Sequence, residues 1–297
     1  MTQLSFGVAV TPTDDPTQLR LATSADRAGL DIVAVQDHPY QPTHLEMWTY
    51  LGHLAAHTEN VSLLPDVADL ALRPPALLAK AAASLDVLSG GRVELGVGAG
   101  GIPDAIAAFG GPRHTPGELV DAAAEALRVL RVGLDAEGGS SHVDGRFHRT
   151  GGYRPGPRPP HRIGVWVGAQ RPRLLRVIGE QADGWISPLN IYVPPEAVPA
   201  AQATIDRAAS DAGRDPGAIR RIYNVIGTID GVGGVGLDGS AEHWARTLAG
   251  WTDDLGFDTY IFWPATEPSR QVDQLERFAG AVVPRVRELV DTTVDGR

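Results

Sequence analysis

Two hydrophobic patterns alternate along the chain. Short apolar runs bounded by glycine, proline or aspartate predict strands, and longer stretches with apolar residues three and four positions apart predict helices. The first pair is a strand over Leu4–Val10 and a helix over Pro16–Ala28. The other predicted strands are Ile32–Val35, Val61–Pro65, Val93–Val97, Ile163–Val167, Gly184–Ser187, Ile222–Ile229 and Thr259–Trp263, and the other helices are Glu46–His57, Pro75–Leu88, Glu118–Gly133, Pro172–Gln181, Pro195–Ala212, Ala241–Leu255 and Pro268–Val290.

Eight strand–helix units in 297 residues predict an α/β protein, a (β/α)8 TIM barrel, rather than a doubly wound sheet, which would fit five or six units better. Residues 138–160 interrupt the pattern with a hairpin-like piece over 142–148 and a stiff proline-rich connector. We interpret this stretch as an insertion before strand five, so that residues 1–297 form a single domain.

Residues 73–101 indicate a helix, a tight turn and a strand that ends in glycines: RPPALLAKAAASLDVLSGGRVELGVGAGG. Pro74 and Pro75 begin the helix, where a missing N–H costs nothing, and Ser89–Gly91 end it. Glycines at a strand end let a flat ligand lie against bare backbone. The spacing over Gly96–Gly101 also matches the dinucleotide motif G-x-G-x-x-G, but it follows the fourth strand and no helix follows directly, so we disfavour that assignment.

Composition excludes several classes of chemistry. The chain has no cysteine, which removes disulfides, thiolate nucleophiles and zinc–thiolate sites. Lys80 is its single lysine and lies in a predicted helix, which argues against a Schiff base at a strand end. The net charge of −10 argues against a nucleic-acid partner. The N-terminus lacks signal-peptide features, and no apolar stretch approaches the roughly 20 residues of a membrane span. We therefore expect a soluble cytoplasmic protein with no membrane partner.

Polar residues follow several predicted strands, where a barrel places its chemistry. Asp37-His38 leaves strand two, and imidazole changes charge near neutral pH, so His38 is a candidate general acid or base; a structural loop histidine is the alternative. Asp66 and Asp69 after strand three would make a floor for a planar ring, or belong to an ordinary loop. Gly168–Pro172 follows strand five and begins a helix, and this pattern predicts a phosphate-binding site at the helix N-terminus.

Two further patterns carry less weight. His53 and His57 stand at the i, i+4 spacing of metal ligands, but no glutamate follows His53 and both lie on a helix, so we expect no metal site there. Carboxylates near the strand ends suggest a glycosidase pair, yet no sequence rule pairs them. Aromatic residues near the strand ends suggest an aromatic mouth, with core positions as the alternative: Tyr40, Trp48, Trp185 and Trp263.

Over essentially its whole length the chain resembles the bacterial luciferase-like flavin- and deazaflavin-dependent oxidoreductases. The most specific stretches are residues 29–38, 72–100, 167–169 and 182–185, and the helix–SGGR–strand–glycine run is the strongest of them. The resemblance implies a barrel that binds coenzyme F420, an 8-hydroxy-5-deazaflavin, or alternatively FMN, at its C-terminal face. Gly101 stands where some sugar-phosphate members carry a carboxylate, which argues against that substrate class.

The matching positions carry over one at a time. His38 falls at the family's acid/base histidine, and Asp66-Val67 falls where many members have a non-proline cis peptide under the middle of the ring. Val97–Gly100 would flank the ring or its linker, and Gly168–Gln170 would hold the phosphate. The full set of implied cofactor contacts is Asp37, Asp66, Val67, Ala68, Val97, Gly98, Ala99, Gly100, Gly168, Ala169, Gln170 and Trp185.

Three functions follow as hypotheses. The first is hydride transfer between a deazaflavin and a small organic substrate, with His38 moving the proton, because such cofactors supply the redox chemistry and the protein positions the substrate. The second is an FMN-dependent monooxygenase that uses oxygen, and the third is a non-catalytic barrel that binds a flavin or has no cofactor. The resemblance also implies a homodimer, for which helices Glu46–His57 and Pro75–Leu88 would supply an interface.

Overall fold

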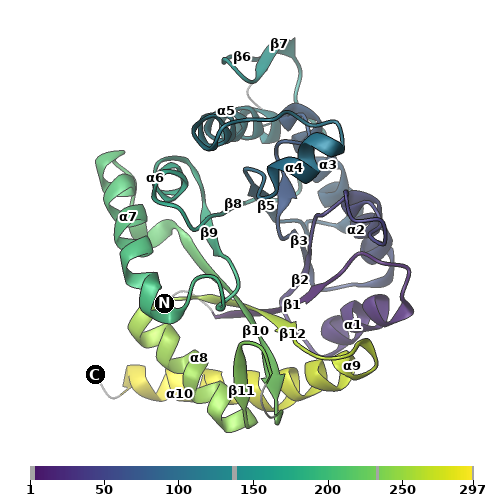
Figure 1. Cartoon of the computed structure of the whole chain (residues 1–297), viewed down its shortest axis with the longest axis vertical. Helices are drawn as coiled ribbons and strands as arrows, with labels where there is room; N and C mark the ends of the chain where they lie inside the picture. The colour runs from purple at the N-terminus through teal and green to yellow at the C-terminus, as the bar shows by residue number, and fades with distance from the viewer. Residues whose placement is uncertain (1–3, 136–138, 232–233, 296–297) are drawn as a thin grey trace.

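The computed structural model describes residues 4–135, 139–231 and 234–295, which form a parallel barrel surrounded by helices (Figure 1). The order of its eight main strands around the barrel is β3-β2-β1-β12-β10-β9-β8-β5, and every neighbouring pair is parallel. These strands are β1 (Ser5–Val10), β2 (Ile32–Val35), β3 (Ser62–Pro65), β5 (Leu95–Gly98), β8 (Val165–Gly168), β9 (Gly184–Ser187), β10 (Arg220–Ile229) and β12 (Thr259–Pro264).

The barrel closes between β3 and β5 through a short seam. A single parallel bridge joins Leu63 to Val93, with the Leu63 N–H donating to the Arg92 carbonyl at 2.6 Å and the Glu94 N–H donating to the Leu63 carbonyl at 3.1 Å. Val93 therefore pairs as predicted, although the continuous strand begins only at Leu95. The predicted (β/α)8 barrel is confirmed, and two short strands add to it: β4 (Ala68–Asp69) beside β5, and β11 (Leu237–Gly239) beside β10.

The helices follow the predicted order with small changes at their ends. Pro195–Ala212 divides into a 3₁₀ turn (Pro195–Ala197) and α7, and Pro268–Val290 is α9 and α10 joined through a π turn at Phe278–Val282. The helices are α1 (Pro16–Arg27), α2 (Met47–His57), α3 (Pro75–Ser89), α5 (Pro116–Leu134), α6 (Pro172–Gln181), α7 (Val198–Asp211), α8 (Ala241–Leu255), α9 (Pro268–Arg277) and α10 (Val283–Asp295). The dimer expected through α2 and α3 stays a prediction, and α3 leaves Leu77 and Leu88 exposed.

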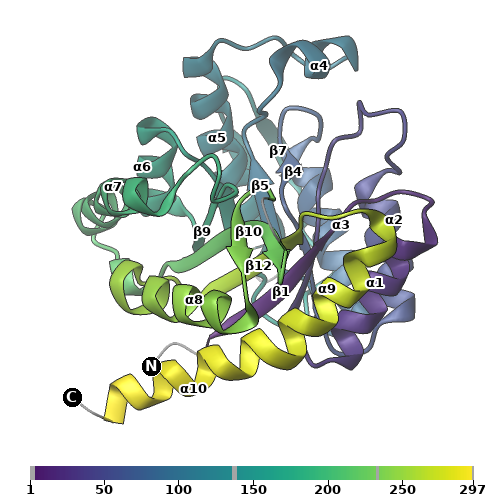
Figure 2. The ribbon, with the colours of Figure 1, turned by 60° about the horizontal axis from the view of Figure 1, so that its bottom comes forward.

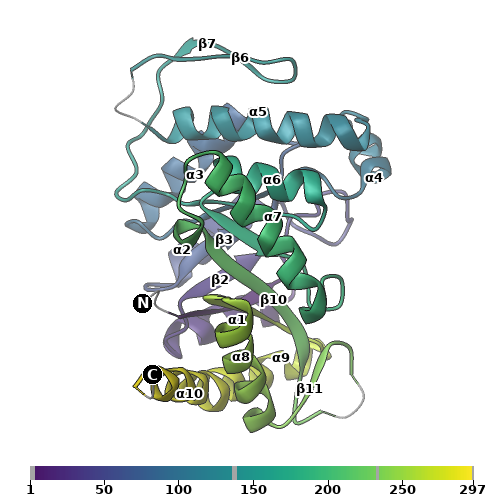
Figure 3. The same ribbon diagram turned by 90° about the vertical axis from the view of Figure 1, so that its left-hand side faces the viewer.

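A short helix absent from the predictions, α4 (Pro103–Ala108), follows β5 and lies at the opposite end of the molecule from α10 (Figure 2). The insertion after α5 forms an antiparallel hairpin of β6 (Ser141–Asp144) and β7 (Arg149–Tyr153), which runs along the outside of α5 (Figure 3). The Glu125 carboxylate on α5 accepts the backbone N–H groups of Arg146, Phe147 and His148 at 2.9, 2.7 and 3.0 Å, which fastens the hairpin turn to the helix. Residues 136–138 lie outside the described residues, so the start of the predicted insertion at 138 cannot be located within them.

Alternation along the strands divides the core into two layers. Val33 and Val35 face the helices, whereas Ile32 and Ala34 belong to the cluster that fills the barrel. The interior cluster consists of Ala9, Ile32, Ala34, Leu64, Trp166, Ile186, Ile222 and Ile261. Residues two positions further along these strands form the next inner layer, at the carboxyl ends: Asp66 after Leu64, Gly168 after Trp166, Asn224 after Ile222 and Trp263 after Ile261.

Gly96 lies in the crowded closing seam. A Cβ atom there would lie 2.1 Å from the Pro65 carbonyl oxygen and 2.9 Å from Ile186 Cδ1. We expect Gly96→Ala to force β3 and β5 apart and to lower the free energy of unfolding by about 1–3 kcal/mol, a typical cost of overpacking. Chemical denaturation of the purified variant measures the change.

The matched control is Gly52→Ala, on the exposed surface of α2, where a new Cβ meets nothing within 4 Å. Alanine there is expected to be neutral or stabilising by about 0.5–1 kcal/mol, because helical glycine has greater backbone freedom in the unfolded chain. Equal unfolding free energies for the two variants would contradict the prediction, because they would show that β3 and β5 accommodate a side chain at position 96 without loss of stability.

Candidate functional site at the carboxyl end of the barrel

A cavity of about 710 Å³ opens at the carboxyl ends of the strands. The loops after β2, β3, β5, β8 and β9 contribute to its wall, and Asn224 of β10 and Trp263 of β12 lie at its floor. Most of the predicted site residues line this one cavity: Asp37, His38, Asp66, Val67, Gly98, Ala99, Gly100, Gly168, Ala169 and Gln170. The barrel therefore brings together residues that are more than 130 positions apart in the sequence.

His38 leaves β2 half-buried in the cavity wall. Its Nδ1 atom lies 2.7 Å from the Tyr40 hydroxyl, and its ring centroid lies 6.2 Å from that of His44. Burial lowers the pKa of His38, and the neighbouring Asp37 carboxylate opposes that shift. His38 is therefore mainly neutral at pH 7, with a hydroxyl that orients its ring. The neutral ring can accept a proton from a substrate, and the protonated ring that results can return it.

Asp37 anchors the same loop from behind. Arg73 contacts both of its oxygens, with Nη2 to Oδ1 at 3.0 Å, and the Asp69 backbone N–H donates to Oδ2 at 2.9 Å. Arg73 also donates to Glu46 at 2.9 Å. Burial raises the pKa of Asp37, and the Arg73 guanidinium opposes the rise. Both Asp37 oxygens are occupied by protein groups, so the side chain fixes the His38 loop to the start of α3; its predicted ring contact stays a prediction.

Val67 and two glycines shape the centre of the cavity. The peptide bond between Asp66 and Val67 is cis, as the resemblance implies. A Cβ atom on Gly98 would lie 2.7 Å from Val67 Cγ2, and one on Gly168 would lie 3.2 Å from both Val67 methyl groups. The two glycines thus leave room for Val67, which lines the cavity between them. A bare glycine wall beside a branched apolar side chain suits a flat ring.

The floor of the cavity is polar. Trp263 Nε1 donates to Asn224 Oδ1 at 2.7 Å, and Asn224 Nδ2 donates to the Ser187 carbonyl at 3.1 Å and to Asp66 Oδ1 at 3.4 Å. Burial raises the pKa of Asp66 to about 7. The sequence prediction did not include Asn224, although an amide within the otherwise apolar strand Ile222–Ile229 is a signal, because a buried amide needs partners.

The start of α6 forms the side of the cavity assigned to phosphate. Residues Gly168–Leu174 line it, and Arg171 at the N-cap makes no side-chain capping bond. The first-turn N–H groups of such a helix favour an anion. Arg173 brings a positive charge near the mouth of the cavity. Its side chain is half-exposed and also pairs with the Asp121 carboxylate at 3.0 Å. The arrangement fits the predicted phosphate-binding site.

Three predicted contacts do not reach the cavity. Ala68 and Val97 are fully buried and pair with each other in β4 and β5. The rim position predicted for Trp185 is wrong: the side chain is fully buried, donates from Nε1 to the Ala169 carbonyl at 2.9 Å and stacks on Phe257. Trp48 packs against the core, whereas Tyr40 and Trp263 do line the cavity.

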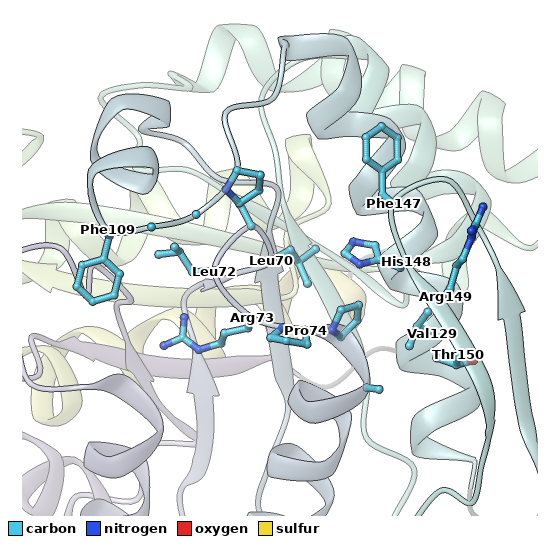
Figure 4. Close-up of a pocket in the computed structure, with 16 residues that line it drawn as sticks. Leu70, Leu72, Arg73, Pro74, Phe109, Val129, Phe147, His148, Arg149 and Thr150 are labelled. Carbon is cyan, nitrogen blue, oxygen red and sulfur yellow. The ribbon is translucent and has the colours of Figure 1, made fainter.

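A second hollow of about 540 Å³ lies between the start of α3, the loop after α4 and the hairpin turn (Figure 4). Arg73 and Phe109 lie on one side of it, and Phe147, His148 and Arg149 lie on the other. It shares no lining residue with the cavity at the strand ends. Its link to the site is Arg73, whose guanidinium holds Asp37.

The described ranges contain no group of three or more histidine, aspartate or glutamate side chains placed to hold a metal ion. His57 Nδ1 instead bonds the His53 carbonyl at 2.8 Å, and both histidines are exposed on α2. Within the same ranges, no helix combines the length and apolar character needed to cross a membrane.

The sequence model of the luciferase-like monooxygenase family matches residues 5–279, which includes every strand of the barrel. The chain belongs to the luciferase-like monooxygenase family. It is therefore an enzyme, and the proteins similar to it include F420-dependent and FMN-bound enzymes. Phthiodiolone/phenolphthiodiolone dimycocerosates ketoreductase of Mycobacterium tuberculosis is 34% identical over 196 residues, which cover 63% of this chain and 48% of that protein.

Solved structures of other enzymes share the fold. An F420-dependent secondary alcohol dehydrogenase, in complex with an F420-acetone adduct, superposes with a TM-score of 0.83 at 16% identity, over 96% of this chain and 99% of that one. The oxygenating constituent of 3,6-diketocamphane monooxygenase from Pseudomonas putida, in complex with FMN, gives 0.75 at 17% identity over 96% and 99%. At these identities the likeness establishes that this chain shares their barrel fold.

Proposed function

We propose that this enzyme uses coenzyme F420 to transfer hydride to or from a small organic substrate at the C-terminal face of the barrel. The observation that carries the proposal is the position of His38, a mainly neutral histidine in the wall of the cavity that Val67, Gly98 and Gly168 also line. When bound, the deazaflavin supplies the hydride chemistry. The protein must then hold the ring, orient the substrate and move one proton.

The residues present fit that cofactor. The wall of Val67, Gly98 and Gly168 would hold the ring, since all three residues line the cavity and the glycines allow Val67 to pack there. The N–H groups at the start of α6, with Arg171 beside them, would hold the phosphate. The part of the cavity between His38, Tyr40 and Trp263 remains for the substrate.

His38 performs the proton step in this proposal. When a carbonyl is reduced, protonated His38 donates to the developing alkoxide oxygen; when an alcohol is oxidised, neutral His38 accepts the hydroxyl proton. The Tyr40 hydroxyl on Nδ1 keeps the ring oriented through both steps. A carbonyl–alcohol pair is the substrate class we favour, because the related ketoreductase and the structurally similar alcohol dehydrogenase are both named for that chemistry.

Titration of the purified protein with coenzyme F420 and with FMN, followed by fluorescence, tests the assignment. We expect coenzyme F420 to bind more tightly than FMN. Acetone and isopropanol with the matching redox state of the coenzyme then test turnover. Preferential binding of FMN would instead favour the oxygen-using monooxygenase of the second hypothesis, and binding of neither would favour a barrel without redox activity.

A further inference from the structure

Asp66 is a buried carboxyl group in the cavity that the proposed hydride transfer does not use. It follows β3 and occupies the inner layer above Leu64. Its Oδ1 atom accepts a hydrogen bond from Asn224 Nδ2 at 3.4 Å. Its Oδ2 atom is fully buried and has no hydrogen-bond partner among the described residues. A buried polar atom without a partner costs free energy, so its presence on a cavity floor points to a ligand atom.

The hydrogen bonds among the neighbours of Asp66 leave that oxygen without a donor. Trp263 fixes the orientation of Asn224 by donating to its Oδ1, and Asn224 Nδ2 is already shared between Asp66 Oδ1 and the Ser187 carbonyl. Ser187 Oγ is also buried without a partner. The amide therefore has no further donor to offer, and Asp66 Oδ2 is the free polar atom of this floor that belongs to a titratable group.

Among the described residues, Asp66 also has no positive partner. Facing residues on β5, β8, β9, β10 and β12 are uncharged: Gly98, Gly168, Ser187, Asn224 and Trp263. The titratable groups elsewhere on the cavity wall are Asp37, His38, Tyr40 and Asp69, together with Arg171 and Arg173 at the start of α6. Burial raises the pKa of Asp66 to about 7, so the neutral acid is a major form at and below neutral pH. A neutral carboxyl carries an O–H group that must donate to an acceptor.

We propose that Asp66 binds the ligand of this cavity by donating a hydrogen bond from Oδ2 to one of its neutral carbonyl oxygens. The inference rests on the proposed function, which supplies two sources of such an oxygen: a carbonyl of the coenzyme ring or the carbonyl of a ketone substrate. Either oxygen complements a neutral O–H donor and is repelled by an ionised carboxylate.

Two variants separate the donor from the shape of the side chain. Asp66→Asn keeps a neutral N–H donor of similar size, and Asp66→Leu keeps the approximate volume without a donor. Circular dichroism and thermal melting first establish that each variant is folded. Calorimetric titration with coenzyme F420 then measures the first source, and titration of acetone into the saturated coenzyme complex, followed by absorbance, measures the second.

We expect Asp66→Leu to weaken binding of one of these two ligands about tenfold, the loss typical of one hydrogen bond. A loss confined to the coenzyme assigns the ring carbonyl as acceptor, and a loss confined to acetone assigns the substrate. The wild type should bind that ligand more tightly at pH 6 than at pH 8.5, whereas Asp66→Asn should follow a flatter profile. At each pH, the ratio of the wild-type affinity to the Asp66→Asn affinity cancels the effect of ionisation of the coenzyme itself.

If Asp66→Leu binds both ligands at pH 6 as tightly as the wild type does, the donor role of Asp66 is overturned and the proposed function is not affected. If Asp66→Leu does not fold, identical pH profiles for the wild type and Asp66→Asn overturn it in the same way. Absence of coenzyme binding by the wild type would overturn the proposed function and, with it, the donor role of Asp66.

Discussion

Replacing His38 with alanine should reduce turnover about 10²–10⁴-fold, the usual contribution of a general acid or base. Coenzyme affinity should remain within about twofold, because the ring and phosphate contacts that we propose come from Val67, Gly98 and the start of α6. The expected loss is in kcat, since His38 acts on the reacting proton. Steady-state kinetics and a coenzyme titration on the same preparation measure both quantities.

The pH profile of the wild type gives an independent check on His38. Burial lowers its pKa below the ordinary value of about 6.5. At saturating coenzyme and substrate, carbonyl reduction needs the protonated ring, so its kcat should fall as pH rises through that lowered pKa. Alcohol oxidation needs the neutral ring, so its kcat should rise through the same pKa and stay level above it. Both inflections should disappear in the alanine variant.

His53→Ala is the matched control, because His53 is exposed on α2 and does not line the cavity. It should leave kcat and the pH profile unchanged. Wild-type turnover in His38→Ala would remove His38 from the mechanism, and a loss of coenzyme affinity equal to the loss of turnover would make it a binding residue instead.

Replacing Arg73 with alanine should lower the free energy of unfolding by about 3–5 kcal/mol, because breaking a buried ion pair leaves an uncompensated charge. The Asp37 side chain is 1% exposed and that of Arg73 is 14% exposed. Asp37 would then retain the Asp69 N–H as its remaining partner in this cluster. Urea denaturation at several pH values measures the loss.

The loss should grow with pH. Without Arg73, burial acts on Asp37 unopposed, so its pKa in the folded state rises further above that of the unfolded chain. A carboxyl with a raised folded pKa loses stability as pH increases from the unfolded value toward the folded one. The variant should therefore be closest to the wild type near pH 4 and furthest from it near pH 8.

Arg113→Ala provides the matched control, because Arg113 pairs with Asp104 where both side chains are mostly exposed, at 66% and 85%. Such a pair contributes about 0–1 kcal/mol. The double variant Asp37→Asn/Arg73→Ala should recover part of the loss, since it removes the stranded charge. If Arg73→Ala is no more destabilising than Arg113→Ala, the Asp37 pair does not hold the loop.

Local sequence predicted the elements and the end of the barrel that carries the site. Pro75 and Gly90 bound α3 because proline fits a helix start and Gly90 adopts a φ of 75° at its end. Thr115 and Glu118 form a capping box at the start of α5, two residues before the predicted boundary. These signals are local, so one stretch of chain suffices to read them.

Trp185 shows where such prediction fails. Barrel strands are buried on both faces, so the apolar run Gly184–Ser187 does not reveal which residues point inward. The structure turns Trp185 toward Phe257 outside the barrel and Ile186 toward its interior. Because neighbouring strand residues point to opposite faces, an error of one residue in the expected orientation exchanges a ligand contact for a core position.

The sequence by itself determined the order of the strands and helices, the glycine-rich wall and the position of His38 at a strand end, because spacing, capping and turn chemistry act between near neighbours. Tertiary structure alone decided that Arg73 holds Asp37, that Trp263 bonds Asn224 and that Asn224 bonds Asp66. Asp66 and Asn224 are 158 positions apart. Their contact depends on the register of the closed barrel, because the pairing of each strand with its neighbour sets which side chains point inward.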